Sequence, residues 1–131
     1  MRLTLLKSKL HRATVTGADL HYEGSIALGP DLRRAARLLV HERVEVYNCH
    51  NGERFATYVI AGSRPGEVML NGAAARLVQP GDAVIIAAYA EFTPAEARRH
   101  RPTVVLLDAQ NRLRRRPAVA KPRRGQIGAG V

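Results

Sequence analysis

The stretch that decides the fold is Val84-Ile85-Ile86-Ala87-Ala88-Tyr89, an unbroken apolar run that follows the turn-forming residues Pro80-Gly81-Asp82. A run this short, rich in branched side chains and preceded by turn formers, predicts a strand rather than a helix. Because no charged residue interrupts it, we expect the strand to be buried on both faces. The chain is therefore expected to fold around a β-sheet.

Further short strands are predicted on both sides of this run, because β-branched and other apolar residues cluster or alternate there between turn formers. These strands span residues 3–16, 25–28, 44–47, 55–61 and 104–107. Asn51-Gly52 is a typical hairpin turn. Two brief helices are also predicted, one capped by Asp31 with apolar residues at helical spacing through Leu39, and one that begins at the capping box of Thr93. This pattern predicts a mainly β protein, a small β-barrel with a few short helices.

The length of 131 residues suits one domain with a modest core, and an enzyme this small often completes its active site with a neighbouring subunit. The single cysteine, Cys49, allows no intrachain disulfide and fits a reducing compartment. The chain opens with no recognisable signal segment, and no apolar stretch reaches membrane-spanning length. We therefore expect a cytoplasmic protein that forms an oligomer.

The formal net charge of +10 raises the alternative of a non-catalytic basic β-barrel that binds nucleic acid. Much of this charge lies between Arg112 and Arg124, where prolines and terminal glycines predict a basic, flexible tail over residues 111–131, outside a domain of residues 1–110. Aromatic residues make up only 5% of the chain, so platforms for base stacking are not evident. Nucleic acid is therefore the less favoured partner.

Gly24-Ser25 is the pair that points to chemistry. Glycine reaches backbone conformations that other residues avoid, so the Gly24 carbonyl is expected in a strained turn beside the Ser25 hydroxyl. Attack by that hydroxyl, an acyl shift, β-elimination and hydrolysis would leave a pyruvoyl group in place of Ser25. Most Gly-Ser pairs are ordinary turns, so the surrounding sequence has to support this interpretation.

Three blocks surround the pair: Lys7-Ser8-Lys9-Leu10-His11-Arg12, Asn51-Gly52-Glu53-Arg54-Phe55-Ala56-Thr57-Tyr58 and Asn71-Gly72-Ala73-Ala74-Ala75. With these blocks, in order and spacing as far as about Asp108, the chain closely resembles the pyruvoyl-dependent aspartate 1-decarboxylase family. The resemblance implies a six-stranded double-psi β-barrel, assembled as a homotetramer with its active sites at subunit interfaces.

The resemblance also implies a proenzyme that cleaves itself between Gly24 and Ser25 into a β chain, residues 1–24, and an α chain, residues 25–131. The expected reaction converts L-aspartate to β-alanine and carbon dioxide for pantothenate and coenzyme A biosynthesis. It proceeds through a Schiff base to the pyruvoyl group derived from Ser25, without pyridoxal phosphate or a metal.

Site residues follow from the same resemblance. Ser25 and Tyr58 are the catalytic residues, and Tyr58 is the proton donor; Thr57 acts with Gly24 and Ser25 in processing. The substrate-binding residues are Lys9, Arg54, Thr57, Gly72, Ala73 and Ala74, and His11, Tyr22 and Asn71 surround them.

Chemical properties of these residues agree with such roles but do not require them. The planar fork of Arg54 matches a carboxylate, and Arg54 shares strand parity with Tyr58 while Thr57 has the opposite parity. Lys9 and His11 likewise share one face of a strand. Without the resemblance, Arg54 and Lys9 would be ordinary exposed residues and Tyr58 a half-buried packing residue.

Overall fold

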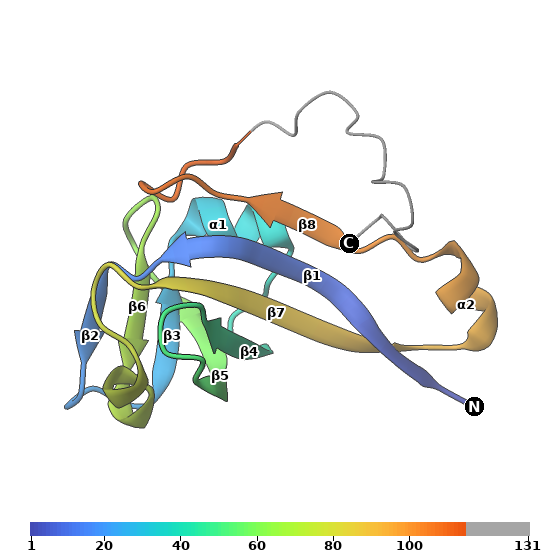
Figure 1. The fold of residues 1–131 in the computed structure, drawn as a ribbon. Coiled ribbons are helices and arrows are strands. Elements are labelled where there is room, and N and C mark those ends of the chain that lie inside the picture. Colours follow the sequence, from blue (N-terminus) through green and yellow to red (C-terminus); the bar gives the residue numbers. More distant parts are fainter. Residues whose placement is uncertain (115–131) are drawn as a thin grey trace.

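The computed structural model describes residues 1–114, and their secondary structure is mainly β with a few short helices, as predicted (Figure 1). The strands are β1 Leu3–Thr14, β2 Gly17–Asp19, β3 Ser25–Leu28, β4 Arg43–Asn48, β5 Arg54–Ala61, β6 Val68–Asn71, β7 Ala83–Phe92 and β8 Thr103–Leu106. The helices are α1 Pro30–Ala36, the 3-10 helix η1 Gly72–Leu77 and α2 Pro94–Arg99.

The strands form one sheet in the order β2-β6-β3-β5-β4-β7-β1-β8. Its longest ladder is the antiparallel pair of β1 and β7, which extends toward the N-terminus beyond the other strands (Figure 1). Three neighbouring pairs are parallel, namely β1 with β8, β2 with β6 and β3 with β5. Six strands lie between the two ends of this order, and β2 and β8 form the ends.

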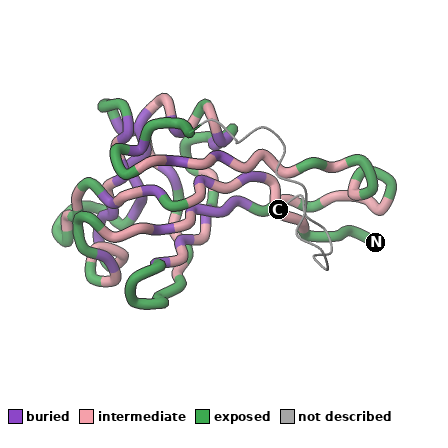
Figure 2. Tube along the Cα trace, turned by 45° about the horizontal axis from the view of Figure 1, so that its top comes forward, coloured by how far each residue is buried: buried purple, intermediate pink, exposed green. Residues whose placement is uncertain are grey.

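The core lies on one face of this curved sheet, where alternate residues of β1, β4 and β5 point inward, whereas all four residues of β3 are buried. Leu10 of β1, Val46 of β4, Val59 of β5 and Ile86 of β7 are each at most 1% exposed. Figure 2 shows the buried stretches gathered in the body of the protein, while the extension that carries the N-terminus is intermediate or exposed. The alternation of apolar residues that predicted strands from the sequence thus places their side chains in the core.

The prediction that residues 84–89 are buried on both faces holds in part. Ala87 and Ala88 are buried, whereas Tyr89 is 41% exposed. β4 pairs with β7 only from Val84 to Ala87, so beyond Ala87 the strand β7 has β1 as its one neighbour. An apolar run in the sequence cannot show where the neighbouring strand ends.

The first helix differs from its prediction. Its N-cap is Gly29, and the carboxylate of Asp31 accepts the Gly66 N–H instead of capping the helix, so the prediction of an Asp31 cap is wrong. The helix ends at Arg37, which adopts the left-handed conformation at φ 56°, and Leu39 lies beyond it, 73% exposed. Helical spacing continues to Leu39 in the sequence, but the backbone turns away before it.

The second helix agrees with its prediction. Thr93 and Glu96 form both hydrogen bonds of the capping box, and Pro94 follows the cap. The strands β2 and β6 were not predicted. β2 consists of Gly-Ala-Asp, residues with low β-propensity, and it is formed by pairing with β6.

Residues 111–114 pack with the rest of the domain. Asn111 is 2% exposed and its amide bonds both Thr14 backbone groups and the Gly66 carbonyl, while Leu113 pairs with Leu107. The other residues of the predicted tail, 115–131, lie outside the described residues. Within the described part of the chain, no helix is both long and apolar enough to cross a membrane.

Candidate active site

Ser25 is the first residue of β3 and is 1% exposed, although it follows an exposed turn. Its hydroxyl donates to the Glu23 carbonyl at 3.0 Å and accepts a hydrogen bond from Nδ2 of Asn71 at 3.1 Å. Asn71 is 2% exposed and lies opposite Ser25 in the antiparallel pair of β3 and β6. A buried serine hydroxyl with two defined partners is held in one orientation beside the Gly24–Ser25 bond.

Gly72 packs directly on Gly24, the residue before this bond. A Cβ atom at position 72 would lie 2.6 Å from Cα of Gly24 and 2.7 Å from its nitrogen, and Gly72 has φ 67°. Gly24 itself has no positive φ, so the strained turn expected there is not of the left-handed kind. The position where the backbone requires glycine is therefore 72, because two main-chain segments approach each other there.

Tyr58 and Thr57 lie on β5, the strand that pairs with β3 in parallel. Ile26 pairs with Val59 in the parallel ladder, and extending this register brings Tyr58 level with Ser25 and Thr57 level with Gly24. Tyr58 is 38% exposed, whereas Thr57 is half-buried on the inward face. The opposite parity predicted for these two residues is confirmed, since each points to a different side of β5.

Lys9 and His11 form a second group on β1. Both are half-buried and point outward, because Ser8 and Leu10 between and beside them are buried. Desolvation by burial lowers the pKa of His11, and the charges of Lys9 and Arg12 lower it further. Nδ1 of His11 is buried and bonds no group among the described residues. This neutral imidazole can accept or donate one further hydrogen bond.

Arg54 begins β5 and stacks on Tyr47 of β4, with its guanidinium carbon 4.0 Å from the ring centroid. The Tyr47 hydroxyl lies 2.9 Å from that of Tyr89 and donates to Glu45 at 3.2 Å. Burial first, and then the hydrogen bond with Tyr89, raise the pKa of Tyr47 above its ordinary value. Stacking on a neutral phenol orients the guanidinium and leaves its N–H groups available for a carboxylate.

These residues form two separate clusters within one chain. The first, the serine cluster, consists of Gly24, Ser25, Tyr58, Asn71 and Gly72. The second, the cationic cluster, consists of Lys9 and His11 on β1, whereas Arg54 lies apart from both clusters at the start of β5. β1 is four strands from β3 in the sheet order, roughly 19 Å along the sheet, and Arg54 is four residues before Tyr58, roughly 13 Å along the strand.

A cavity of about 290 Å³ adjoins the serine cluster and is lined in part by Tyr22, Ala27 and Asn71. Asp19 and Glu67 also line it, whereas its described lining residues include no lysine or arginine. Two larger cavities, of about 450 and 390 Å³, contain none of the predicted site residues. An acidic ligand bound beside Ser25 would thus need its cations from outside this cavity.

Ala73 and Ala74 lie in η1, directly after Gly72, with Ala73 exposed and Ala74 half-buried. Tyr22 is 56% exposed and its carbonyl lies close to Gly72. Among residues 1–114, no three or more His, Cys, Asp or Glu side chains are grouped to hold a metal ion.

The sequence did not predict several residues that contact one another around these clusters. Tyr47 and Tyr89 are spaced far apart in the chain, and only the pairing of β4 with β7 brings them together. Asn48 and Asp82 bond each other at 2.8 Å, and Asp82 also pairs with His50, for which no partner was predicted. The one available signal was a polar residue, Asn48, at the inward parity of a strand.

This geometry defines a class of small, mainly β proteins. They have a buried serine at a Gly-Ser bond and a cationic cluster apart from it. A sequence model described as aspartate decarboxylase matches residues 1–114. The chain belongs to the aspartate decarboxylase family.

Curated relatives agree with this assignment over most of their length. An aspartate 1-decarboxylase of Bdellovibrio bacteriovorus is 58% identical over 113 residues, which are 86% of this chain and 90% of that protein. One of Maricaulis maris is 56% identical over 121 residues, 92% of this chain and 100% of that protein. One of Heliobacterium modesticaldum is 54% identical over 129 residues, 98% of this chain and 94% of that protein. These matches favour the enzyme over the nucleic-acid-binding alternative.

Proposed function

We propose that the chain cleaves itself between Gly24 and Ser25 and uses the pyruvoyl group so formed to decarboxylate L-aspartate. As a member of the aspartate decarboxylase family, it is a carboxy-lyase that converts aspartate to β-alanine and carbon dioxide, the step that supplies β-alanine for pantothenate and coenzyme A. The observation that supports self-cleavage is the buried Ser25 hydroxyl, held by Asn71 and the Glu23 carbonyl while Gly72 packs on Gly24.

Processing begins when Oγ of Ser25 attacks the Gly24 carbonyl carbon. The C–N bond breaks, the nitrogen takes the hydroxyl proton, and the amide becomes an ester. Loss of the Cα proton of residue 25 then expels the Gly24 carboxylate, and water replaces the nitrogen, releasing ammonia and leaving a ketone. Thr57, level with Gly24, is the hydroxyl donor proposed for the oxyanion of the first step.

The surroundings of Ser25 fit a pyruvoyl group. Asn71 offers an amide N–H at the position of Oγ, and the site at 1% exposure keeps water away from an electrophilic ketone. When formed, that ketone condenses with the substrate amine and accepts the electron pair that carbon dioxide leaves behind.

Protein groups then bind the substrate and move one proton. Arg54 and Lys9 hold the two carboxylates of aspartate, and Arg54 is suited to a bidentate contact. Backbone N–H groups of Gly72, Ala73 and Ala74 approach the substrate closely because their side chains are small. Tyr58, level with Ser25, delivers a proton to Cα after carbon dioxide has left. His11 and Tyr22 orient the bound groups.

This assignment needs more than one subunit. The serine cluster and the cationic cluster are separated along the sheet, and the described lining of the cavity beside Ser25 holds carboxylates but no cation. The cations therefore come from a neighbouring copy, whose outer sheet face would cover Ser25 of the first. A homotetramer with shared sites is the proposed assembly. We place it in the cytoplasm, because the one cysteine is an exposed free thiol.

Intact-mass analysis of the purified protein tests the proposal. Two fragments should be found, residues 1–24 and a blocked chain that begins at position 25, together with aspartate-dependent release of β-alanine. Ser25→Ala should yield one uncut chain without activity, because no hydroxyl attacks the Gly24 carbonyl. Normal turnover by Ser25→Ala would overturn the pyruvoyl mechanism.

A further inference from the structure

The segment that packs on Gly24 and bonds Ser25 is weakly supported by its own side chains. It runs from Asn71 through the helix η1, whose six residues make a longer run than most 3-10 helices. Its small alanines add little packing, and of these Ala74 is the one that packs against the core. The side chain of Asn71 bonds Ser25 and does not cap η1. The position of this segment therefore depends on how its far end is held.

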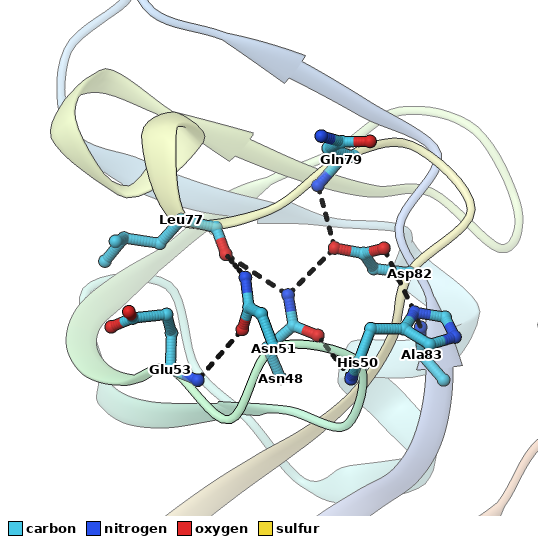
Figure 3. Close-up of polar contacts among 8 residues, drawn as sticks. All are labelled: Asn48, His50, Asn51, Glu53, Leu77, Gln79, Asp82 and Ala83. Atoms are coloured by element: carbon cyan, nitrogen blue, oxygen red, sulfur yellow. Dashed lines mark hydrogen bonds and ion pairs between the residues drawn. The ribbon is translucent and has the colours of Figure 1, made fainter.

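That far end is held by two amide side chains. The carbonyl of Leu77, the last residue of η1, accepts hydrogen bonds from Nδ2 of Asn48 at 3.1 Å and from Nδ2 of Asn51 at 3.0 Å (Figure 3). Asn48 is 3% exposed and is the last residue of β4, paired with Val84 of β7. One donor thus comes from the sheet itself, and the other comes from the hairpin loop.

Asp82 fixes the orientation of the Asn48 amide. Its Oδ2 accepts from Nδ2 of Asn48 at 2.8 Å and from the Gln79 N–H at 2.9 Å, while Oδ1 lies 3.0 Å from Nδ1 of His50 (Figure 3). Oδ1 of Asn48 accepts the His50 N–H at 2.8 Å. Every donor and acceptor of the Asn48 amide is therefore satisfied in one orientation only.

We propose that Asn48, oriented by Asp82, is a positioning residue that sets the placement of residues 71–77 against the scissile bond. The inference rests on the proposed function and names a residue that acts on it from a distance. η1 connects the anchored Leu77 to Gly72 over five residues, about 10 Å at the rise of a 3-10 helix. A displacement of Leu77 would therefore move η1 and change the contact between Gly72 and Gly24.

The test compares Asn48→Ser with Asn111→Ser in purified full-length proenzyme. Both substitutions remove a buried amide that bonds two acceptors, but Asn111 bonds Thr14 and Gly66, away from η1. Asn48→Ser should slow self-cleavage by roughly tenfold. A misplacement of about 1 Å can lower a reaction rate by about 100-fold, and a smaller displacement of η1 should cost less. Asn111→Ser should lose as much thermal stability and cleave within about twofold of the parent rate.

A double-mutant cycle tests whether Asp82 acts through Asn48. Asp82→Asn should slow cleavage when Asn48 is present and add little in the Asn48→Ser background. Equal cleavage rates for Asn48→Ser and Asn111→Ser would overturn the inference. Additive effects of Asp82→Asn and Asn48→Ser on the cleavage rate would overturn the role of Asp82. In both cases cleavage by the parent would leave the proposed function intact.

A second measurement is independent of cleavage. Amide hydrogen exchange of residues 72–77 in uncut protein should be roughly tenfold faster in Asn48→Ser than in Asn111→Ser, because opening of the anchored turn exposes these amides. If the parent fails to cleave, self-processing is refuted and this exchange rate alone decides the inference. Equal exchange in the two variants would overturn it.

Discussion

Replacing Gly72 with alanine should slow self-cleavage at Gly24–Ser25 by about 100-fold while leaving the protein folded. The added Cβ would lie 2.6 Å from Cα of Gly24, and two carbons in contact prefer about 3.6 Å, so the two segments must separate by about 1 Å. Displacement of a reacting group by about 1 Å can lower its rate by about 100-fold.

The cost in stability has two sources. An alanine at φ 67° loses about 1–2 kcal/mol because the left-handed region is unfavourable for a residue with Cβ. Overpacking against Gly24 adds roughly 1–3 kcal/mol. The free energy of unfolding should therefore fall by about 2–5 kcal/mol.

Gly52→Ala is the matched control. Gly52 has φ 76°, and a Cβ there would meet nothing within 4 Å, so this variant carries the backbone strain without the clash. Cleavage is followed by intact mass against time at one temperature, and unfolding by urea titration. If Gly72→Ala cleaves as fast as Gly52→Ala, the close approach of residues 72 and 24 does not position the scissile bond.

Two further predictions concern the later chemistry and the pH dependence. Tyr58→Phe should still be cut but lose most β-alanine formation, because the proton for Cα comes from its hydroxyl; full turnover in a coupled assay would remove Tyr58 from this role. The pKa of Asp82 is lowered from 3.8, first by the Asn48 hydrogen bond and then by the Gln79 N–H. Asp82 therefore stabilises the fold above pH 3.8, and this contribution disappears as the pH falls through its lower folded value. Asp82→Asn should have a lower free energy of unfolding than the parent at pH 7. In urea titrations this difference in free energy should shrink as the pH falls below 3.8; a constant difference would contradict the assigned pKa shift.

The fold class was predictable because strands and capped helices are encoded locally. Apolar runs and alternation located β1, β3, β4, β5, β7 and β8 to within a few residues, and the capping box of Thr93 located α2. The strand β2 was not predictable, because three residues of low β-propensity became a strand only through pairing with β6. The cap at Asp31 failed for a related reason, since its carboxylate bonds Gly66, a residue far away in the chain.

The sequence by itself determined the mainly β class, the shared faces of Lys9 with His11 and of Arg54 with Tyr58, and the Gly-Ser pair, since each depends on residues within a few positions of one another. Only the tertiary structure decided that glycine is required at 72, that Asn71 holds the Ser25 hydroxyl, and that Asn48 and Asp82 anchor the end of η1. These contacts join residues that are distant in the chain. The ladders between strands set their distances, and no local pattern records which strands become neighbours.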